Sequence, residues 1–145
     1  AFLYAAKVAR APYQLAFGPE VVSAGVSGGP VTAGEPARLT AEVDASRLED
    51  ADLDPPPLVA RVEARVGSPF WRGDETAPTL ELQPTDGLLD ELRETVAVEV
   101  ETAGLAPGRH LVYVRAEDAA GHLGPVTAAF LEIAAPPPRR PRGRR

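Results

Sequence analysis

The strongest constraint on the fold is the alternation of apolar and charged residues within residues 109–117, RHLVYVRAE. Val112 and Val114 share one parity, whereas Tyr113 and Arg115 share the other. Successive side chains of a β-strand point to opposite faces, and unpaired charges are rarely buried. We therefore expect the parity of Val114 to face the core and the parity of Tyr113 to face outward.

The same period of two recurs along the chain between turns rich in glycine and proline. We expect seven strands, at residues 21–26, 38–44, 58–66, 79–82, 95–101, 109–117 and 126–133, with one helical turn at residues 88–93. Short strands between frequent turns are typical of a sandwich. The sequence predicts an all-β fold, an antiparallel seven-strand sandwich of the immunoglobulin or fibronectin type with a short N-terminal helix. The chain has no cysteine, which excludes disulfides and thiolate metal sites.

The parity of each predicted strand also gives a core. It consists of small and medium apolar residues and one threonine: Leu39, Ala41, Val43, Val62, Ala64, Val66, Val96, Val98, Val100, Val112, Val114, Ala116, Thr127, Ala129, Leu131 and Ile133.

Three segments differ in composition. An apolar stripe with helical spacing in residues 1–10 predicts the N-terminal helix, which ends before Pro12. We expect residues 1–19 to be the end of a longer helix and a linker, and residues 20–134 to form the sandwich. Residues 135–145 are rich in proline and arginine and are expected to be a disordered tail.

The net charge of −6 combines two parts of opposite sign. Five arginines lie in the last seven residues, and the rest of the chain has 10 basic and 21 acidic residues, a net charge of −11. An acidic body argues against nucleic acid binding by the folded part. The arginine tail either attracts an anionic surface or has no dedicated partner. The sequence contains no run of about 18 apolar residues, so it predicts no membrane-spanning helix.

Few residues are candidates for catalysis or metal binding. The two histidines, His110 and His122, are too far apart in sequence for a familiar metal-ligand pair. We expect a ring nitrogen of His110 to contact a backbone carbonyl, and we expect His122 to be a solvated turn residue. The sequence contains no G-x-S-x-G, H-E-x-x-H, P-loop or C-x-x-C motif. We therefore expect no catalytic residue and no cofactor in this chain.

Asp50, Asp52 and Asp54 have the alternating spacing with which a calcium-binding loop begins. Pro55 and Arg61, however, stand where such a loop needs its turn glycine and its bidentate glutamate. A solvated acidic loop is favoured, and a weak calcium site is the alternative.

Phe70 and Trp71 stand side by side in the segment SPFWRGD, and Trp71 is the only tryptophan. Adjacent aromatic residues in a loop can form a ligand-binding or interface site, a platform on which a sugar or peptide stacks. The favoured interpretation is that one ring caps the core while the other shields a loop.

The opening segment, residues 3–19 (LYAAKVARAPYQLAFGP), closely resembles the last helix and exit segment of bacterial zinc carboxypeptidases of the carboxypeptidase A and T type. The remainder resembles the immunoglobulin-like domain that some of these enzymes carry after their catalytic domain. This second resemblance rests on Glu63, SPFW at 68–71, DG at 86–87 and GRHLVYVRAEDAAGHLGP at 108–125.

The resemblance implies a non-catalytic accessory domain of a secreted or periplasmic zinc metallocarboxypeptidase. The family's H-x-x-E zinc motif is missing, because Tyr113 follows His110 by three positions and Pro125 follows His122 by three. Zinc is therefore expected in the parent catalytic domain and not in this chain. The implied partner is that peptidase domain in the same polypeptide, together with cell-wall or protein substrate.

The alternative function is an independent immunoglobulin-like module that binds carbohydrate or peptide through Phe70 and Trp71. Both functions are non-enzymatic for this chain, and a change of tryptophan fluorescence with candidate ligands would distinguish them.

Overall fold

Eight β-strands form within the part of the chain that the computed structural model describes, residues 18–46, 57–73, 77–138 and 141–143. The strands are β1 Glu20–Val26, β2 Val31–Thr32, β3 Ala37–Asp44, β4 Val59–Val66, β5 Leu80–Pro84, β6 Arg93–Val100, β7 Gly108–Asp118 and β8 Thr127–Ala134. A short 3-10 helix, η2 at Phe70–Arg72, follows β4. No helix among these residues is long and apolar enough to cross a membrane.

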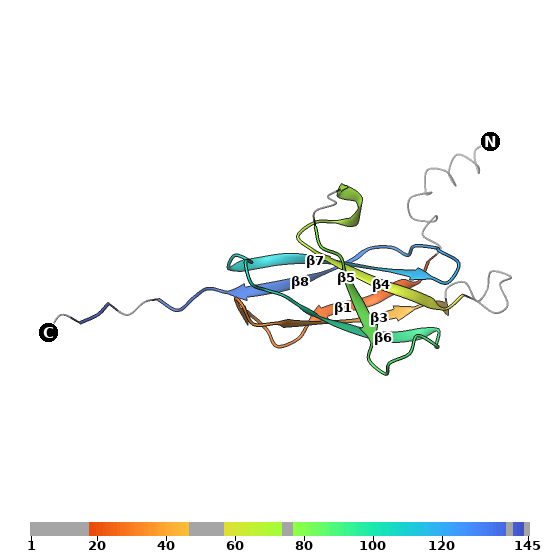
Figure 1. Ribbon diagram of the computed structural model, residues 1–145, viewed down its shortest axis with the longest axis horizontal. Coiled ribbons are helices and arrows are strands. Elements are labelled where there is room, and N and C mark those ends of the chain that lie inside the picture. Colours follow the sequence, from red (N-terminus) through yellow and green to blue (C-terminus); the bar gives the residue numbers. More distant parts are fainter. Residues whose placement is uncertain (1–17, 47–56, 74–76, 139–140, 144–145) are drawn as a thin grey trace.

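The strands form one sheet in the order β1-β3-β6-β5-β4-β7-β8-β2. Neighbouring strands are antiparallel except β2 and β8, which are parallel. The sheet folds over at β5, so that β1, β3 and β6 form one half and β4, β7, β8 and β2 form the other (Figure 1). The two halves face each other like the layers of an immunoglobulin- or fibronectin-like sandwich.

The fold-over occurs at β5 because its two ends pair with different strands. Residues 80–82 pair with β4, whereas Gln83 and Pro84 pair with β6. Beyond the strand, the N–H of Thr85 donates to the carbonyl of Thr95 at 2.9 Å, which continues the pairing with β6. One five-residue strand therefore links the two halves of the sheet.

The core lies between the two halves and consists mostly of valine, leucine and alanine. Its buried members are Val21, Ala37, Leu39, Ala41, Val43, Ala45, Val59, Val62, Ala64, Leu82, Val96, Val100, Val112, Val114, Ala116, Ala129, Leu131 and Ile133. The predicted facing of β7 is confirmed, because Val114 is fully buried and Tyr113 is only half-buried. Val66, Val98 and Thr127, predicted as core, are half-buried instead.

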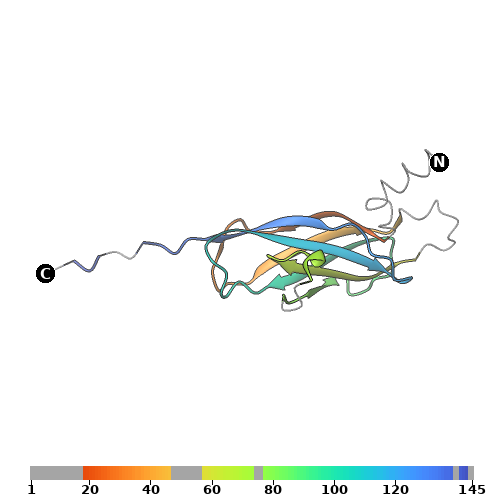
Figure 2. The ribbon, with the colours of Figure 1, turned by 90° about the horizontal axis from the view of Figure 1, so that it is seen from above.

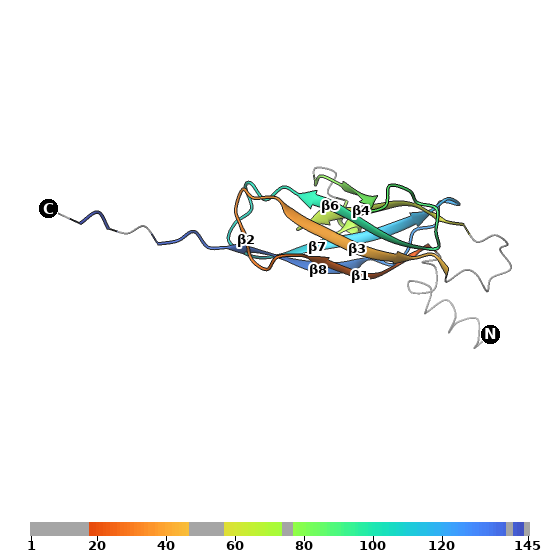
Figure 3. The ribbon, with the colours of Figure 1, turned by 90° about the horizontal axis from the view of Figure 1, so that it is seen from below.

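The other open side of the sandwich is closed where the chain enters β1. The N–H of Gly18 donates to the carbonyl of Leu123 at 3.2 Å. The hydroxyl of Thr127 donates to the carbonyl of Val21 at 2.9 Å. These bonds hold β1 beside β8, as Figure 3 shows from below.

The turn between β7 and β8 is shaped by Asp118. Its buried carboxylate accepts hydrogen bonds from the N–H groups of Ala120 and His122, each at 2.9 Å. The turn brings Gly124 against the entry segment so closely that a Cβ there would lie 1.8 Å from the carbonyl oxygen of Pro19. Only glycine fits this backbone contact.

Three predictions about the secondary structure are wrong. The sandwich has eight strands and is mixed, not antiparallel with seven, because β2 pairs in parallel with β8. With two residues between turns, β2 is too short for alternation to reveal it. Residues 88–92, predicted as part of a helical turn, form a loop before β6. The carboxylate of Glu94 fixes this loop by accepting hydrogen bonds from the N–H groups of Asp90 and Glu91, both at 2.8 Å.

The predicted end segments are described only in part. The helix predicted at residues 1–10 lies outside the described residues. The sandwich begins with β1 at Glu20 and ends with β8 at Ala134. Of the tail, residues 135–138 and 141–143 are described, and these form neither helix nor strand.

The facing of β7 predicts the relative cost of two substitutions. Val114→Ala should lower the free energy of unfolding by about 1–3 kcal/mol, because it removes buried methyl groups and leaves a cavity. Tyr113→Ala should cost about 1 kcal/mol or less, because it removes only surface contacts across the strands. Urea unfolding of both variants measures the difference, and a larger loss for Tyr113→Ala would contradict the assignment.

The contact between Gly124 and Pro19 predicts a second effect. Gly124→Ala should destabilise the domain by about 1–3 kcal/mol, because the backbone of the entry segment must move away. Gly25→Ala in β1 is the matched control, since a Cβ there meets nothing within 4 Å. Thermal unfolding should show a lower midpoint for Gly124→Ala alone, and equal midpoints would argue that the entry segment does not pack as described.

Candidate interaction surface

The outer face of the half formed by β4, β7 and β8 carries aromatic and arginine side chains. In residues 61–65 and 109–117, the odd-numbered side chains point to this face. The cross-strand register places Arg65 opposite Tyr113. Helix η2 lies over the same face (Figure 2).

Ion pairs tie β4 to β7 on this face. Arg61 pairs with Glu117 across the strands and with Glu63 on its own strand, the latter at 3.3 Å. Glu63 also pairs with Nε of Arg115 at 3.3 Å, so its largely buried carboxylate bridges two guanidinium groups. The hydrogen bond to Glu117, together with the charge of Glu63, raises the pKa of Arg61.

Phe70 of η2 contacts two arginines. Its ring centroid is 4.1 Å from Cζ of Arg115 and 5.2 Å from Cζ of Arg65. Both distances are within the range of a cation–π contact. Nε of Arg65 also donates to the hydroxyl of Thr79 at 3.0 Å, which fixes the position of that guanidinium group. Phe70 is thereby held half-buried on the outer face.

Trp71 extends from η2 over β7. The connection before the helix is anchored by a hydrogen bond from the N–H of Gly67 to the carbonyl of Leu111, at 2.8 Å. The Trp71 ring meets Tyr113 edge to face, with centroids 5.7 Å apart and planes at 78°. Even with this contact, Trp71 remains 70% exposed.

Phe130 on β8 adds a second exposed ring. It is 59% exposed, and Cζ of Arg109 lies 4.8 Å from its centroid. Leu111, directly opposite Phe130 in the sheet, is also exposed. We call this surface the aromatic–arginine face; its members are Phe70, Trp71, Leu111, Tyr113, Phe130, Arg65, Arg109 and Arg115.

All four aromatic residues in the described part of the chain belong to this face. They are Phe70, Trp71, Tyr113 and Phe130, and the apolar core contains none. Aromatic side chains normally supply much of a domain's buried apolar area. Here, the largest apolar side chains are concentrated on one outer surface.

The geometry suits a protein partner better than a flat sugar ring. The planes of Trp71 and Tyr113 are 78° apart, so one sugar ring cannot stack on both. Tryptophan, tyrosine and arginine are the residues that most often dominate binding at protein interfaces. The face offers apolar contact area together with guanidinium donors for carboxylates.

The sequence predicted only part of this surface. Phe70 and Trp71, its ligand or interface candidates, lie together on the outer face, and neither ring caps the core. Tyr113, Phe130 and Arg109 were missed as members. The parity of β7 predicted that Tyr113 lies on the outer face. Its contact with Trp71 depends on the register between β4 and β7 and on the position of η2, which the sequence pattern does not give.

Both histidines have structural partners. Nε2 of His110 is 2.7 Å from the carbonyl oxygen of Ala106, the kind of contact predicted from sequence. Nδ1 of His122, an exposed residue of the β7–β8 turn, is 3.0 Å from Oδ2 of Asp118. Among the residues that the structure describes, no group of three or more acidic or histidine side chains could hold a metal ion.

The candidate calcium ligands Asp50, Asp52 and Asp54 lie outside the described residues. They fall within residues 47–56. A weak calcium site there stays a prediction from sequence.

Comparisons with known proteins show the fold. No family model and no curated protein matches the sequence. Among solved structures, the chain is similar to the alkylpurine DNA glycosylase AlkC of Pseudomonas fluorescens bound to DNA with an abasic site analog. The TM-score is 0.52 at 16% identity, over 92% of this chain. The chain spans only 38% of the glycosylase chain. At this identity, the likeness shows the fold alone.

The fibronectin(III)-like modules of Clostridium thermocellum CbhA are also similar, with a TM-score of 0.37 and 13% identity. The match covers 77% of this chain and 96% of the module chain. The strand order and the two facing halves make this chain a small all-β domain of the immunoglobulin or fibronectin kind.

The bridging position of Glu63 predicts a charge-dependent loss of stability. Glu63→Gln should cost about 1 kcal/mol in urea unfolding, because Arg61 and Arg115 both lose a carboxylate partner. The cost should shrink partly in 1 M salt, because the guanidinium group of Arg61 is exposed enough for its attraction to Glu63 to be screened.

Glu81→Gln is the matched control on β5. Glu81 lies directly opposite Glu63 in the sheet, so its neutralisation removes a like-charge pair and should not destabilise. Equal losses for the two variants would argue against the bridging role of Glu63.

Proposed function

We propose that this domain is a non-catalytic accessory domain that docks onto a protein partner through its aromatic–arginine face. The observation that carries the proposal is the placement of every described aromatic side chain on this face, with Trp71 70% and Phe130 59% exposed. Such residues gain little from the monomer's own fold. A contiguous exposed apolar patch marks an interaction site.

The proposed partner is the catalytic domain of a secreted or periplasmic zinc carboxypeptidase in the same polypeptide. This part rests on the resemblance of residues 3–19 to the last helix of such enzymes, and the comparisons with known proteins give no evidence for a carboxypeptidase. The hydrogen bond from Gly18 to Leu123 supports it, because it fixes the sandwich to the entry segment. In this proposal the zinc and the peptidase chemistry belong to that domain, and the sandwich stabilises it or holds it near cell wall or protein substrate.

The second candidate function is an independent carbohydrate- or peptide-binding module. The exposure of Trp71 favours it, because a single accessible indole ring can stack on a sugar. The perpendicular contact of Trp71 with Tyr113 disfavours it, since it leaves no flat platform of two rings.

The test is a calorimetric titration of this chain with the domain encoded directly upstream of residue 1. Phe130→Ala and Trp71→Ala should each weaken binding about 10- to 100-fold, as expected for central interface residues. Val22→Ala is the matched control. Val22 is 55% exposed but lies on β1, in the other half of the sheet, and its substitution should leave the affinity unchanged.

The outcomes separate the parts of the proposal. An upstream sequence without an H-x-x-E motif would show that the partner is not a carboxypeptidase. Unchanged affinity for Phe130→Ala and Trp71→Ala would remove the aromatic–arginine face as the docking surface. A shift of Trp71 fluorescence on adding chitotetraose, absent with the upstream domain, would favour the carbohydrate module.

A further inference from the structure

The last residues of β6 have a neighbour on one side only. β6 pairs with β3 along its whole length, from Arg93 to Val100. On its other side it pairs with β5 only through Val96 and Ala97. Opposite the rest of β6, the residues of β5 pair with β4 instead. A notch therefore opens between the end of β6 and the start of β5.

The backbone of Glu99 faces this notch. The N–H of Ala45 donates to the carbonyl of Leu92, just before β6. The same register continues along β6, and hydrogen-bonded pairs recur at every second residue. The even-numbered residues of β6 therefore bond to β3. The carbonyl of Thr95 accepts from Thr85 of the β5 side, so odd-numbered residues point the other way. In an antiparallel sheet both polar groups of one residue point to the same side. The pairing of β6 with β5 ends at Ala97, so the N–H and carbonyl of Glu99 face the notch with no strand partner on that side.

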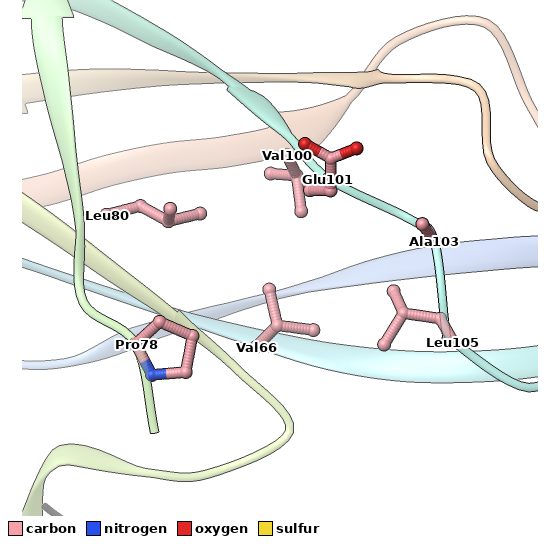
Figure 4. A pocket seen from close by; sticks show the side chains of 7 residues that line it. All are labelled: Val66, Pro78, Leu80, Val100, Glu101, Ala103 and Leu105. Atoms are coloured by element: carbon pink, nitrogen blue, oxygen red, sulfur yellow. The ribbon is translucent and has the colours of Figure 1, made fainter. Parts of the chain in front are cut away.

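An apolar pocket lies directly inside this edge. It has a volume of about 310 Å³ and is lined by Val66, Pro78, Leu80, Val100, Glu101, Ala103 and Leu105. In Figure 4 the side chains of Val66, Leu80, Val100 and Leu105 converge on the same space. The volume has room for one or two aliphatic side chains.

The wall of the pocket formed by Ala103 and Leu105 is held in place by hydrogen bonds. The buried hydroxyl of Thr102 donates to the carbonyl of Glu35 and accepts from the N–H of Gly34 at 2.9 Å. The N–H of Leu105 donates to the carbonyl of Thr102 at 3.1 Å. A ligand therefore meets a wall that is already formed, which lowers the entropic cost of binding.

The charges around the notch are mainly negative. Glu99 and Glu101 are exposed on β6 and just after it, and Glu81 is exposed on β5. Arg38 lies opposite Glu99 but on β3, away from the notch. Arg65, on the adjoining part of β4, is engaged with Thr79 on the outer face. A cationic ligand suits this rim.

We propose that the notch binds an extended basic peptide by strand addition to β6. A residue opposite Glu99 would exchange two backbone hydrogen bonds with it and direct a lysine side chain outward. The residues on either side would then point inward, into the apolar pocket. The unused backbone groups of Glu99 select a polypeptide over a lipid or a sugar. This site is separate from the aromatic–arginine face and does not rest on the function proposed for it.

The probe is a capped heptapeptide, acetyl-Val-Lys-Leu-Lys-Val-Lys-Leu-amide, added to the isotopically labelled chain and followed by NMR. Saturable shifts are expected at the amides of residues 98–105, and hydrogen exchange of the Glu99 amide should slow at least tenfold. Ala103→Trp places a large side chain at the pocket and should weaken binding at least tenfold. Ala119→Trp, at an exposed alanine in the β7–β8 turn, is the matched control and should bind as the unsubstituted chain does.

Two altered peptides test the mode of binding. Methylation of the three lysine backbone nitrogens should abolish binding, because the donor to the Glu99 carbonyl is lost. Glutamate in place of lysine should weaken it at least tenfold. Equal binding by the methylated peptide, or by Ala103→Trp, would overturn the proposal. So would concentration-dependent protection of Glu99 without peptide, which would show that a second copy of the chain covers the edge.

Discussion

The two-layered fold depends on β5, which pairs with β4 at its start and with β6 at its end. Residues 80–82 pair with β4, while Gln83 and Pro84 pair with β6. A strand that stayed on β6 would extend an open sheet whose apolar face met water. By crossing, β5 turns the sheet over and brings Leu82, which is buried, between the two halves. The same crossing leaves Glu99 without a partner strand on one side, so the core and the notch have one cause.

The core that this fold-over encloses needs no aromatic residue. Valine, leucine and alanine make up most of it. Many of these side chains are almost completely buried, Leu39 and Leu131 among them. Branched aliphatic residues pack well between two twisted layers. The aromatic residues are thus not required inside, and Phe130 and Trp71 remain mostly exposed in the positions that they occupy. The docking function proposed above would account for their placement, which the stability of the domain does not require.

The sequence sufficed for what depends on a single strand. The facing of Val114 and Tyr113 followed from parity, and the contact of His110 with a backbone carbonyl followed from its place on the apolar face of a strand. The parallel pairing of β2 could not be predicted in this way, because a strand of two residues shows no alternation of apolar and polar side chains. The meeting of Trp71 and Tyr113 depends on η2 and on the register between β4 and β7, which are properties of the folded sheet. Periodicity gives each strand a face, but it does not say which strands become neighbours.

Charge distinguishes the two surfaces. On the outer face, Glu63 and Glu117 are used in pairs with Arg61 and Arg115, while Arg109 is stacked on Phe130. A guanidinium group stacked on a ring keeps its N–H edge available for a carboxylate, so this face suits an acidic and apolar partner. The notch has the opposite preference, because carboxylates surround its apolar floor. The two proposed partners are therefore of unlike charge, and exchanging them between the surfaces would place like charges together.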